Sequence, residues 1–232
     1  MAGKRKSYKE RKNGKRSKKY TTKKYRKEAK AVKLYYPGVC PDVMATKLTF
    51  NENRTVNEAG INVRVYRGNS VFDPDFTGVG GQPLGRDQWT QFYRRYRVTA
   101  SKFTVKFSCL TDSTVGVQVI LVPLTTSTAL SDPEQYLEAH NAKVSKVTFD
   151  TGSSSDEISC YMTVAEMRGS PADIVQYDSN LSSIAAAVPA HQFFWHVVTF
   201  DSSGGLNTVN AHINEKIEYW TEFYDRTTLP RS

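Results

Sequence analysis

The sequence has few of the features that mark a secreted protein or an enzyme. Its only three cysteines, Cys40, Cys109 and Cys160, lie far apart and form no CxxC pair. An odd count without paired spacing argues against a disulfide framework and predicts reduced thiols in a cytosolic or nuclear protein. The start, MAGKRK, is not followed by an apolar stretch, so we expect no secretory signal.

Long apolar runs are missing as well. The longest, IAAAVPAHQFFWHVV from Ile184, is interrupted by Pro189 and His191 and is too short to span a bilayer. We therefore expect no stable insertion into a membrane.

Motifs for catalysis and metal binding are also scarce. The four histidines form neither HExxH nor a His-x-His pair, no GxSxG is present, and GVGGQP at residues 78–83 lacks the spacing of a phosphate loop. Asp73 and Asp75 form a lone D-x-D pair, which more often makes turn hydrogen bonds than a metal site. The sequence therefore predicts no enzyme, small-molecule substrate, cofactor or metal, with a metal ion at the D-x-D pair as an open alternative.

Acidic residues are scarce in one segment, the first 33 residues. It holds 16 Lys and Arg against two acids, Glu10 and Glu28, and so carries 16 − 2 = +14. Residues 34–232 hold the other 16 bases and 21 acids, which gives 16 − 21 = −5. We expect two parts, a basic arm at residues 1–33 and a single folded domain at residues 34–232.

The arm has too few apolar residues to offset the entropy of ordering, so we expect it to be disordered in isolation. Fully extended, it would reach about 110 Å. Its three tyrosines, Tyr8, Tyr20 and Tyr25, are interleaved with bases. This mixture suits single-stranded nucleic acid, because cations release phosphate counterions while aromatic rings stack on bases. The expected nucleic-acid-binding residues are Lys4, Arg5, Lys6, Lys9, Arg11, Lys12, Lys15, Arg16, Lys18, Lys19, Lys23, Lys24, Arg26, Lys27 and Lys30.

The same run of bases has other interpretations, namely a nuclear-import signal, a ribosome-like anchor, a patch for anionic membranes or a solubilising tail. Membrane binding is the weakest of these, because the arm has no Trp, Phe or Leu to anchor it. Nuclear import is compatible with nucleic-acid binding, so import factors are candidate partners.

The domain is predicted to be all β. The segment VNAHINEKIEYWTEFY, from Val209, alternates apolar and polar residues along its length, which is typical of a long half-buried strand. A change of parity after Ala100 predicts a bulge near Ser101–Lys102. The expected strands begin at Met44, Ile61, Arg97, Val115, Lys143, Glu157, Gln192 and Val209. About eight strands predict an antiparallel sandwich, but periodicity alone does not select a jelly roll.

Helices are expected to be few and short. SDPEQYLEAH offers Ser131 as N-cap, and TVAEMRG offers a capping box of Thr163 and Glu166 that ends at Gly169. RDQWTQFYRRY, at residues 86–96, has aromatic residues at helical spacing and predicts a turn or two of helix.

The most distinctive stretch is GNSVFDPDFTGVGGQPLGRDQWTQFYRRYRV, from Gly68 to Val98. Its elements are RGNS, FDPDFTG, a Gly-rich bend with GQP, and DQWTQFYRRYRV running into a strand. With the basic arm and the ending EYWTEFYDRT, they resemble capsid proteins of small circular single-stranded DNA viruses, the circovirus-like group. The likeness covers the arm, the early domain and the last strand, and it leaves the middle loops unmatched.

This resemblance implies an eight-stranded jelly-roll subunit, sixty copies of which form a small icosahedral shell around a single-stranded DNA genome. It implies the virion and the host nucleus as locations, host import factors as partners, and neither catalysis nor a cofactor. Arg94, Arg95 and Arg97 then become candidates, with Trp89, for inner-face or intersubunit contacts. Ion pairs with neighbouring acids remain the alternative for the arginines.

Two other functions stay open at this point. One is a non-viral nucleic-acid-binding module with a basic tail on a β-sandwich, and the other is a lectin-like sandwich with an import tail. The acidic balance of the domain and the absence of RRM, zinc-finger and helix-turn-helix motifs disfavour the first.

Overall fold

The computed structural model of the chain describes residues 40–110, 115–148, 155–204 and 207–227. These residues belong to one of the two units into which the chain divides, Tyr36–Ser232. The binding residues expected in the arm, and its expected disorder, lie outside the described residues. Within them, no helix is both long and apolar enough to cross a membrane.

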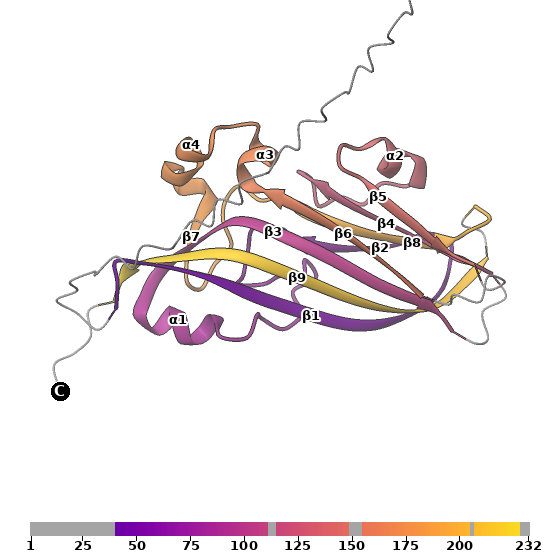
Figure 1. The fold of residues 1–232 in the computed structure, drawn as a ribbon, viewed down its shortest axis with the longest axis horizontal. Coiled ribbons are helices and arrows are strands. Elements are labelled where there is room, and N and C mark those ends of the chain that lie inside the picture. Colours follow the sequence, from indigo (N-terminus) through magenta and orange to yellow (C-terminus); the bar gives the residue numbers. More distant parts are fainter. Residues whose placement is uncertain (1–39, 111–114, 149–154, 205–206, 228–232) are drawn as a thin grey trace, which may run out of the picture. The chain divides into compact units, whose positions relative to one another are not determined.

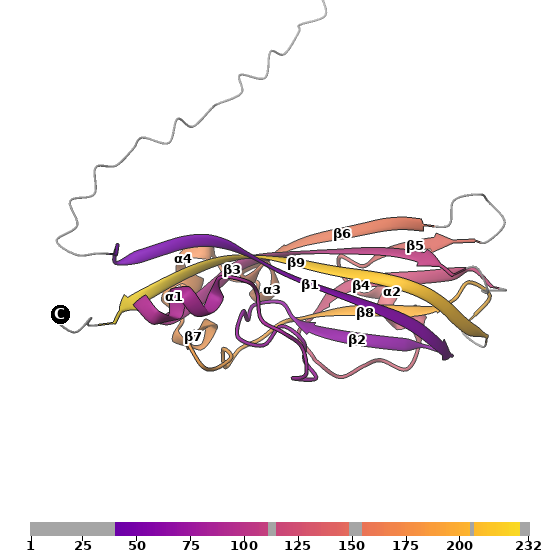
Figure 2. The same cartoon turned by 90° about the horizontal axis from the view of Figure 1, so that it is seen from below.

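Two antiparallel sheets form the described domain (Figure 1). The first sheet has the order β1 (Val43–Ala59), β9 (Thr208–Arg226), β3 (Tyr93–Cys109) and β6 (Ser155–Thr163), and the short β7 (Ser182–Ile184) also pairs with β3. The second sheet has the order β2 (Asn62–Arg67), β8 (Phe194–Asp201), β4 (Val117–Leu124) and β5 (Lys143–Val147). Figure 2 shows β6 and β9 of the first sheet above β8 and β2 of the second.

The strand order is that of a jelly roll. Leaving β7 aside, successive strands cross to the opposite sheet except between β4 and β5. As a result β9 lies between β1 and β3, and β8 lies between β2 and β4, which is the double Greek key of the eight-stranded jelly roll. The predicted all-β, eight-stranded sandwich is confirmed, with β7 as an additional strand.

The core between the sheets follows the alternation read from the sequence. The β9 side chains predicted to share one face are all buried, namely Val209, Ala211, Ile213, Ile217, Tyr219 and Phe223. On the opposite sheet, the ring of Trp195 in β8 packs against Phe103 of β3 with centroids 6.0 Å apart. The indole Nε1 of Trp195 donates to the hydroxyl of Ser101 at 2.9 Å, so the polar atom carried into this core has a partner.

The second sheet is covered on its outer side too. Ile120 and Val122 of β4 and Val198 and Phe200 of β8 pack there with Tyr136 of α2 (Pro133–Glu138). Every residue of β8 is consequently buried, in keeping with its run of apolar residues.

The predicted bulge in β3 exists and lies slightly earlier in the chain. The register with β9 shifts between Val98 and Ala100, so Thr99 is the extra residue, rather than Ser101–Lys102. Ser101 is buried, which made the change of parity appear later in the sequence than it occurs in the strand.

Two predicted helix boundaries need correction. The helix α1 (Arg86–Phe92) ends where β3 begins, so Tyr93 and Tyr96 are buried strand residues and not helical ones. The N-cap of α2 is Asp132 and not Ser131, because Asp132 Oδ1 accepts the backbone N–H of Glu134 at 2.9 Å.

The third predicted helix is confirmed. In α3 (Val164–Arg168), Thr163 and Glu166 form the reciprocal capping box, and Gly169 ends the helix with φ 61°. The sequence did not predict α4 (Ala172–Tyr177) or the 3₁₀ turn Ser179–Leu181, which connect α3 to β7.

Candidate functional site: the outer face of the first sheet and the network beneath it

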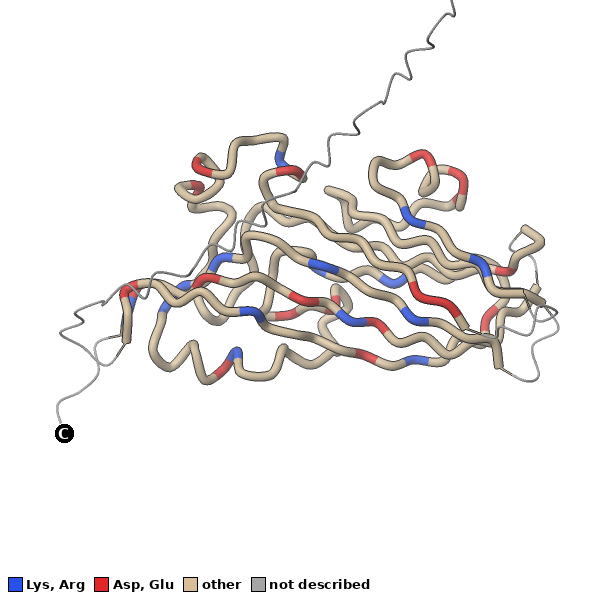
Figure 3. Tube along the Cα trace, viewed as in Figure 1, with Lys and Arg blue, Asp and Glu red and all other residues tan. Residues whose placement is uncertain are grey.

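The outer face of the first sheet gathers charged, amide, hydroxyl and aromatic side chains from four strands. Figure 3 marks the Lys and Arg positions of these strands in blue and the Asp and Glu positions in red. We define the outer face by residues that alternate with the core positions: Lys47, Thr49, Asn51 and Asn53 of β1, Asn214, Lys216, Glu218, Trp220 and Glu222 of β9, Arg95, Arg97, Lys102, Thr104 and Lys106 of β3, and Glu157, Ser159 and Tyr161 of β6. These residues include six cations and three acids, so the face carries 6 − 3 = +3. A domain that is acidic as a whole therefore has one face of the opposite sign.

Each of the three acids of the outer face forms an ion pair with a cation of the same face, and some cations have no such partner among the described residues. Lys47 Nζ lies 2.7 Å from Glu218 Oε1, and Lys106 Nζ lies 3.1 Å from Glu157 Oε2. The Lys47 hydrogen bond lowers the pKa of Glu218 below its usual value, and nearby lysines add to this effect. Lys102 forms no ion pair with any described residue. The face therefore keeps positive charge for an anionic partner.

Aromatic rings lie among these cations. The Tyr161 side chain is half exposed, and its ring meets Trp220 edge-on with centroids 5.3 Å apart. Lys47 Nζ lies 5.9 Å from the centroid of the Trp220 ring. Exposed rings beside cations suit single-stranded nucleic acid, because bases stack while phosphates bind the cations.

The outer face could not be recognised from the sequence, because its cations are spread along the chain and do not form one run of bases. The cations of the face come from three strands, β1, β3 and β9, and only the sheet brings them side by side. The one signal in the sequence is the set of positions that alternate with core residues in β9, which include Lys216 and Glu218.

The structure separates the three arginines predicted as inner-face contacts. Arg97 is buried and lies 2.6 Å from Glu222 Oε2, so the ion-pair alternative holds for it. Arg95 donates to the hydroxyl of Ser182 at 3.4 Å, whereas Arg94 is exposed.

Trp89, predicted beside the arginines as a contact residue, is half-buried on α1. Its ring stacks on Phe223 with centroids 6.2 Å apart. It therefore packs against the core of its own subunit, and its contact with another copy stays a prediction.

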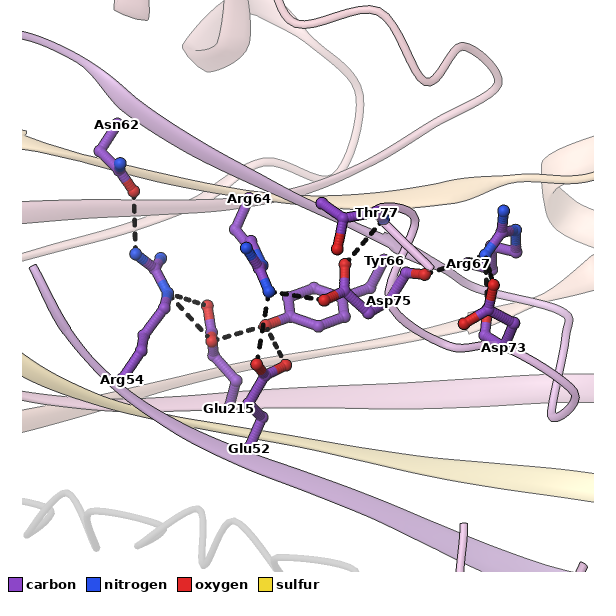
Figure 4. A network of polar contacts seen from close by, with 10 residues as sticks. All are labelled: Glu52, Arg54, Asn62, Arg64, Tyr66, Arg67, Asp73, Asp75, Thr77 and Glu215. Carbon is purple, nitrogen blue, oxygen red and sulfur yellow. Dashed lines mark hydrogen bonds and ion pairs between the residues drawn. The ribbon is translucent and has the colours of Figure 1, made fainter. Parts of the chain in front are cut away.

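Beneath the outer face, a polar network lies between the two sheets (Figure 4). Glu215 of β9 lies at a core position and is fully buried. Arg54 Nε lies 3.1 Å from both of its carboxylate oxygens, and the hydroxyl of Tyr66 donates to Oε2 at 2.7 Å. Burial raises the pKa of Glu215, while the charge of Arg54 acts against this shift. Burial also raises the pKa of Tyr66, so its phenol stays protonated as a donor.

The network continues to the long loop that follows β2. The Tyr66 hydroxyl also lies 3.1 Å from Glu52 Oε2, and Arg64 Nη2 lies 3.4 Å from Glu52 Oε1. The same Arg64 nitrogen lies 2.5 Å from Oδ2 of Asp75, a fully buried residue. The network thus joins β9, β1, β2 and the loop at residues 68–85.

The D-x-D pair makes ion pairs and a turn. Asp73 Oδ2 lies 3.0 Å from Nη1 of Arg67, and Asp75 Oδ1 accepts the backbone N–H of Thr77 at 2.9 Å. Gly80 lies so close that a Cβ there would approach the Asp75 Cβ to 2.8 Å. Arginine and the turn thus engage both carboxylates, as the turn interpretation predicted. In the described ranges, no group of three or more His, Cys, Asp or Glu is placed to hold a metal ion.

Comparison with known proteins gives matches in structure alone. No family model matches the chain, and no curated protein matches it. The structure is similar to that of desmodium yellow mottle tymovirus, with 11% identity over 85% of this chain and 96% of that chain, at a TM-score of 0.43. It is similar to turnip yellow mosaic virus, with 10% identity over 82% and 98% of the two chains, at a TM-score of 0.44.

A third similar structure is the 60-mer BFDV capsid protein, with 12% identity over 82% of this chain and 97% of that chain, at a TM-score of 0.43. Each of these TM-scores is below 0.5.

Proposed function

We propose that this chain is a viral capsid protein that self-assembles into a small icosahedral shell and packages single-stranded DNA through residues 1–33. The observation that carries the proposal is the joining of an eight-stranded jelly roll to a segment of charge +14, while the rest of the chain carries −5. The domain can pack against copies of itself without strong repulsion, and the arm neutralises phosphates. The role of the domain is structural, with no catalytic step.

The outer face of the first sheet is the surface that we assign to the interior of the shell. Its charge of +3, the half-exposed Tyr161, and Lys102, which makes no ion pair within the described part of the chain, fit a nucleic-acid strand. The arm is covalently joined to β1, which belongs to this same sheet. Arm and face then act on one packaged strand.

Contacts between subunits are assigned to the loop at residues 68–85. Val79 and Leu84 at this loop are 86% and 91% exposed, although the network and Arg67 hold Asp75 and Asp73 beneath them. Apolar side chains that are exposed on a well-anchored loop are suited to bury their surface against another copy of the chain. Trp89, on the helix that follows the loop, is assigned to support this contact.

Nuclear import is assigned to the arm as a second use of its bases, with assembly in the host nucleus. The alternative function is a non-viral nucleic-acid-binding module with a basic tail. Both functions predict DNA binding, so assembly is the property that separates them.

The test is to express the full chain, treat the lysate with nuclease, and measure size, mass and absorbance at 260 and 280 nm by size-exclusion chromatography with light scattering. A uniform megadalton particle that protects nucleic acid, digestible by DNase but not by RNase after disruption, is expected. A monomer that stays monomeric after single-stranded DNA is added would support the binding module instead.

A further inference from the structure

A pocket of about 280 Å³ opens on the outer face of the first sheet, where α3 and α4 stand beside β3 and β6. Ala100, Tyr161 and Thr163 line its sheet side, and Ala172 and Val175 line its helical side. Pockets for drug-sized ligands begin at about 300 Å³. This pocket therefore suits one small planar group, with apolar walls to contact the faces of that group.

One wall of the pocket is polar and fixed in place. Arg97, 8% exposed, donates to Glu222 Oε2 at 2.6 Å and to the backbone carbonyl of Gln176, and all three residues line the pocket. The guanidinium carbon also lies 5.5 Å from the centroid of the Tyr224 ring. The buried Nε of Arg97 has no acceptor among the described residues. The wall thus presents a guanidinium donor that is fixed in position and a carboxylate acceptor whose charge Arg97 balances. The polar edge of a base carries both donors and acceptors, so it can pair with both groups.

The bulge in β3 builds the floor of this pocket. Thr99 is the extra residue, and its hydroxyl donates to the backbone carbonyl of Trp220 at 3.2 Å. Thr99 and the neighbouring Ala100 both line the pocket. Bulges of this kind re-aim side chains near functional sites.

The mouth of the pocket lies among the groups that suit a nucleic-acid strand. Tyr161, 51% exposed, lies directly opposite Lys102 on the neighbouring strand. The Trp220 ring contacts Tyr161, and Lys47 Nζ lies over the same Trp220 ring. An aromatic wall, a cation beside it and a polar end are the parts needed to hold a base and its phosphate.

We propose that this pocket binds one base of the single-stranded nucleic acid that the shell packages. Tyr161 stacks on the base, the Arg97–Glu222 pair contacts its polar edge, and Lys102 contacts the adjoining phosphate. The proposal rests on the proposed function and adds a binding site in the folded domain that is separate from the arm.

The test uses the full chain at high salt, where phosphate contacts of the arm weaken and base stacking persists. An oligodeoxynucleotide that contains 5-iodouracil is bound and irradiated, and cross-linked peptides are identified by mass spectrometry. In parallel, fluorescence anisotropy compares a normal oligonucleotide with one of equal length that lacks bases. The variants are Tyr161→Ala, Tyr161→Phe, and Tyr177→Ala as a control for an 85% exposed tyrosine on α4 that does not line the pocket.

A cross-link at Tyr161 is expected, with a loss of roughly fivefold or more in affinity for the normal oligonucleotide in Tyr161→Ala, as for one stacked base. Tyr161→Phe and Tyr177→Ala should bind as the unchanged chain does, and the oligonucleotide without bases should show no difference among the variants. The proposed base site is contradicted if no cross-link forms at Tyr161, or if Tyr161→Ala binds the normal oligonucleotide with the same affinity as the unchanged chain.

The two proposals fail in different ways in this experiment. Cross-links confined to Tyr8, Tyr20 and Tyr25 would leave the packaging function intact while removing the pocket. A change of particle assembly in Tyr161→Ala without any cross-link at Tyr161 would show that the pocket holds part of a second copy, which also overturns the base site.

Discussion

The hydroxyl of Tyr66 lies 2.7 Å from Oε2 of Glu215, and both residues are fully buried between the two sheets. Arg54 approaches the same carboxylate from β1. A carboxylate in this position is stable only while its partners remain, since an unpaired buried charge is costly. The pair therefore makes the packing of β2 on β9 depend on polar complementarity as well as on apolar contact.

Tyr66→Phe removes the donor and leaves the buried carboxylate of Glu215 with one partner fewer. We expect the free energy of unfolding to fall by about 1–3 kcal/mol, measured by urea denaturation. Lys47→Ala is the control, because it breaks an exposed pair with Glu218 and should cost at most about 1 kcal/mol. Equal losses in the two variants would show that the network adds nothing beyond a surface pair.

Asp75→Asn keeps the size of the side chain and removes the charge that Arg64 contacts at 2.5 Å. We expect faster backbone hydrogen exchange and faster proteolysis within residues 68–85, because this contact joins the loop to the network. Asp87→Asn, on an exposed carboxylate that pairs with Arg86, is the matched control and should leave the loop unchanged. Unchanged exchange in Asp75→Asn would mean that Arg67 and the turn suffice to hold the loop.

His196 predicts a dependence of stability on pH. It is fully buried, its Nε2 lies 2.9 Å from the carbonyl of Thr126, and burial lowers its pKa below 6.5. The unfolded state therefore binds a proton more readily, so stability is present above pH 6.5 and is lost as the pH falls below that value. Urea midpoints measured from about pH 7 down to about pH 5 should show the loss. His196→Gln should be less stable at neutral pH and should lose this component of the pH dependence.

The arm predicts a steep dependence of DNA binding on salt. If each of its net charges met a phosphate of a single strand, the log–log slope of affinity against salt would approach about −10, from 0.7 × 14. Anisotropy titrations over a range of salt concentrations measure this slope. Deletion of residues 2–33 should abolish packaging and leave the β signal in circular dichroism. Loss of that signal would contradict the division into arm and domain.

The alternation of β9 was sufficient to predict its buried face, and the count of strands was sufficient for the sandwich. Glu215 was missed because a glutamate at a core position is read as a break in the pattern, and only the approach of Arg54 and Tyr66 from other strands makes its burial possible. In β2 the two faces alternate. The face with Arg64 and Tyr66 turns toward this network, while Val63 packs on the outer side of its sheet.

The outer face and its pocket could not be predicted for a related reason. Lys102 and Tyr161 become neighbours because β3 and β6, two strands distant in sequence, pair within the first sheet, and α4 carries no strong capping signal. Prediction from sequence motifs was correct where the interacting residues lie within a few positions of each other, as in the capping box of Thr163. The predicted N-cap of α2 was wrong by one residue, because Ser131 and Asp132 are both good N-cap residues and only the backbone conformation distinguishes them.

The position of β9 in the strand order sets when the domain can form during synthesis. This strand is the last of the fold, yet it lies between β1 and β3, and it pairs Tyr224 with Val43 across 224 − 43 = 181 positions of the chain. Pairing over such separations is slow, and here it must wait until the ribosome has released nearly all of the described sequence. A nascent chain therefore has no completed first sheet, and the facing edges of β1 and β3 stay unpaired until β9 has been released.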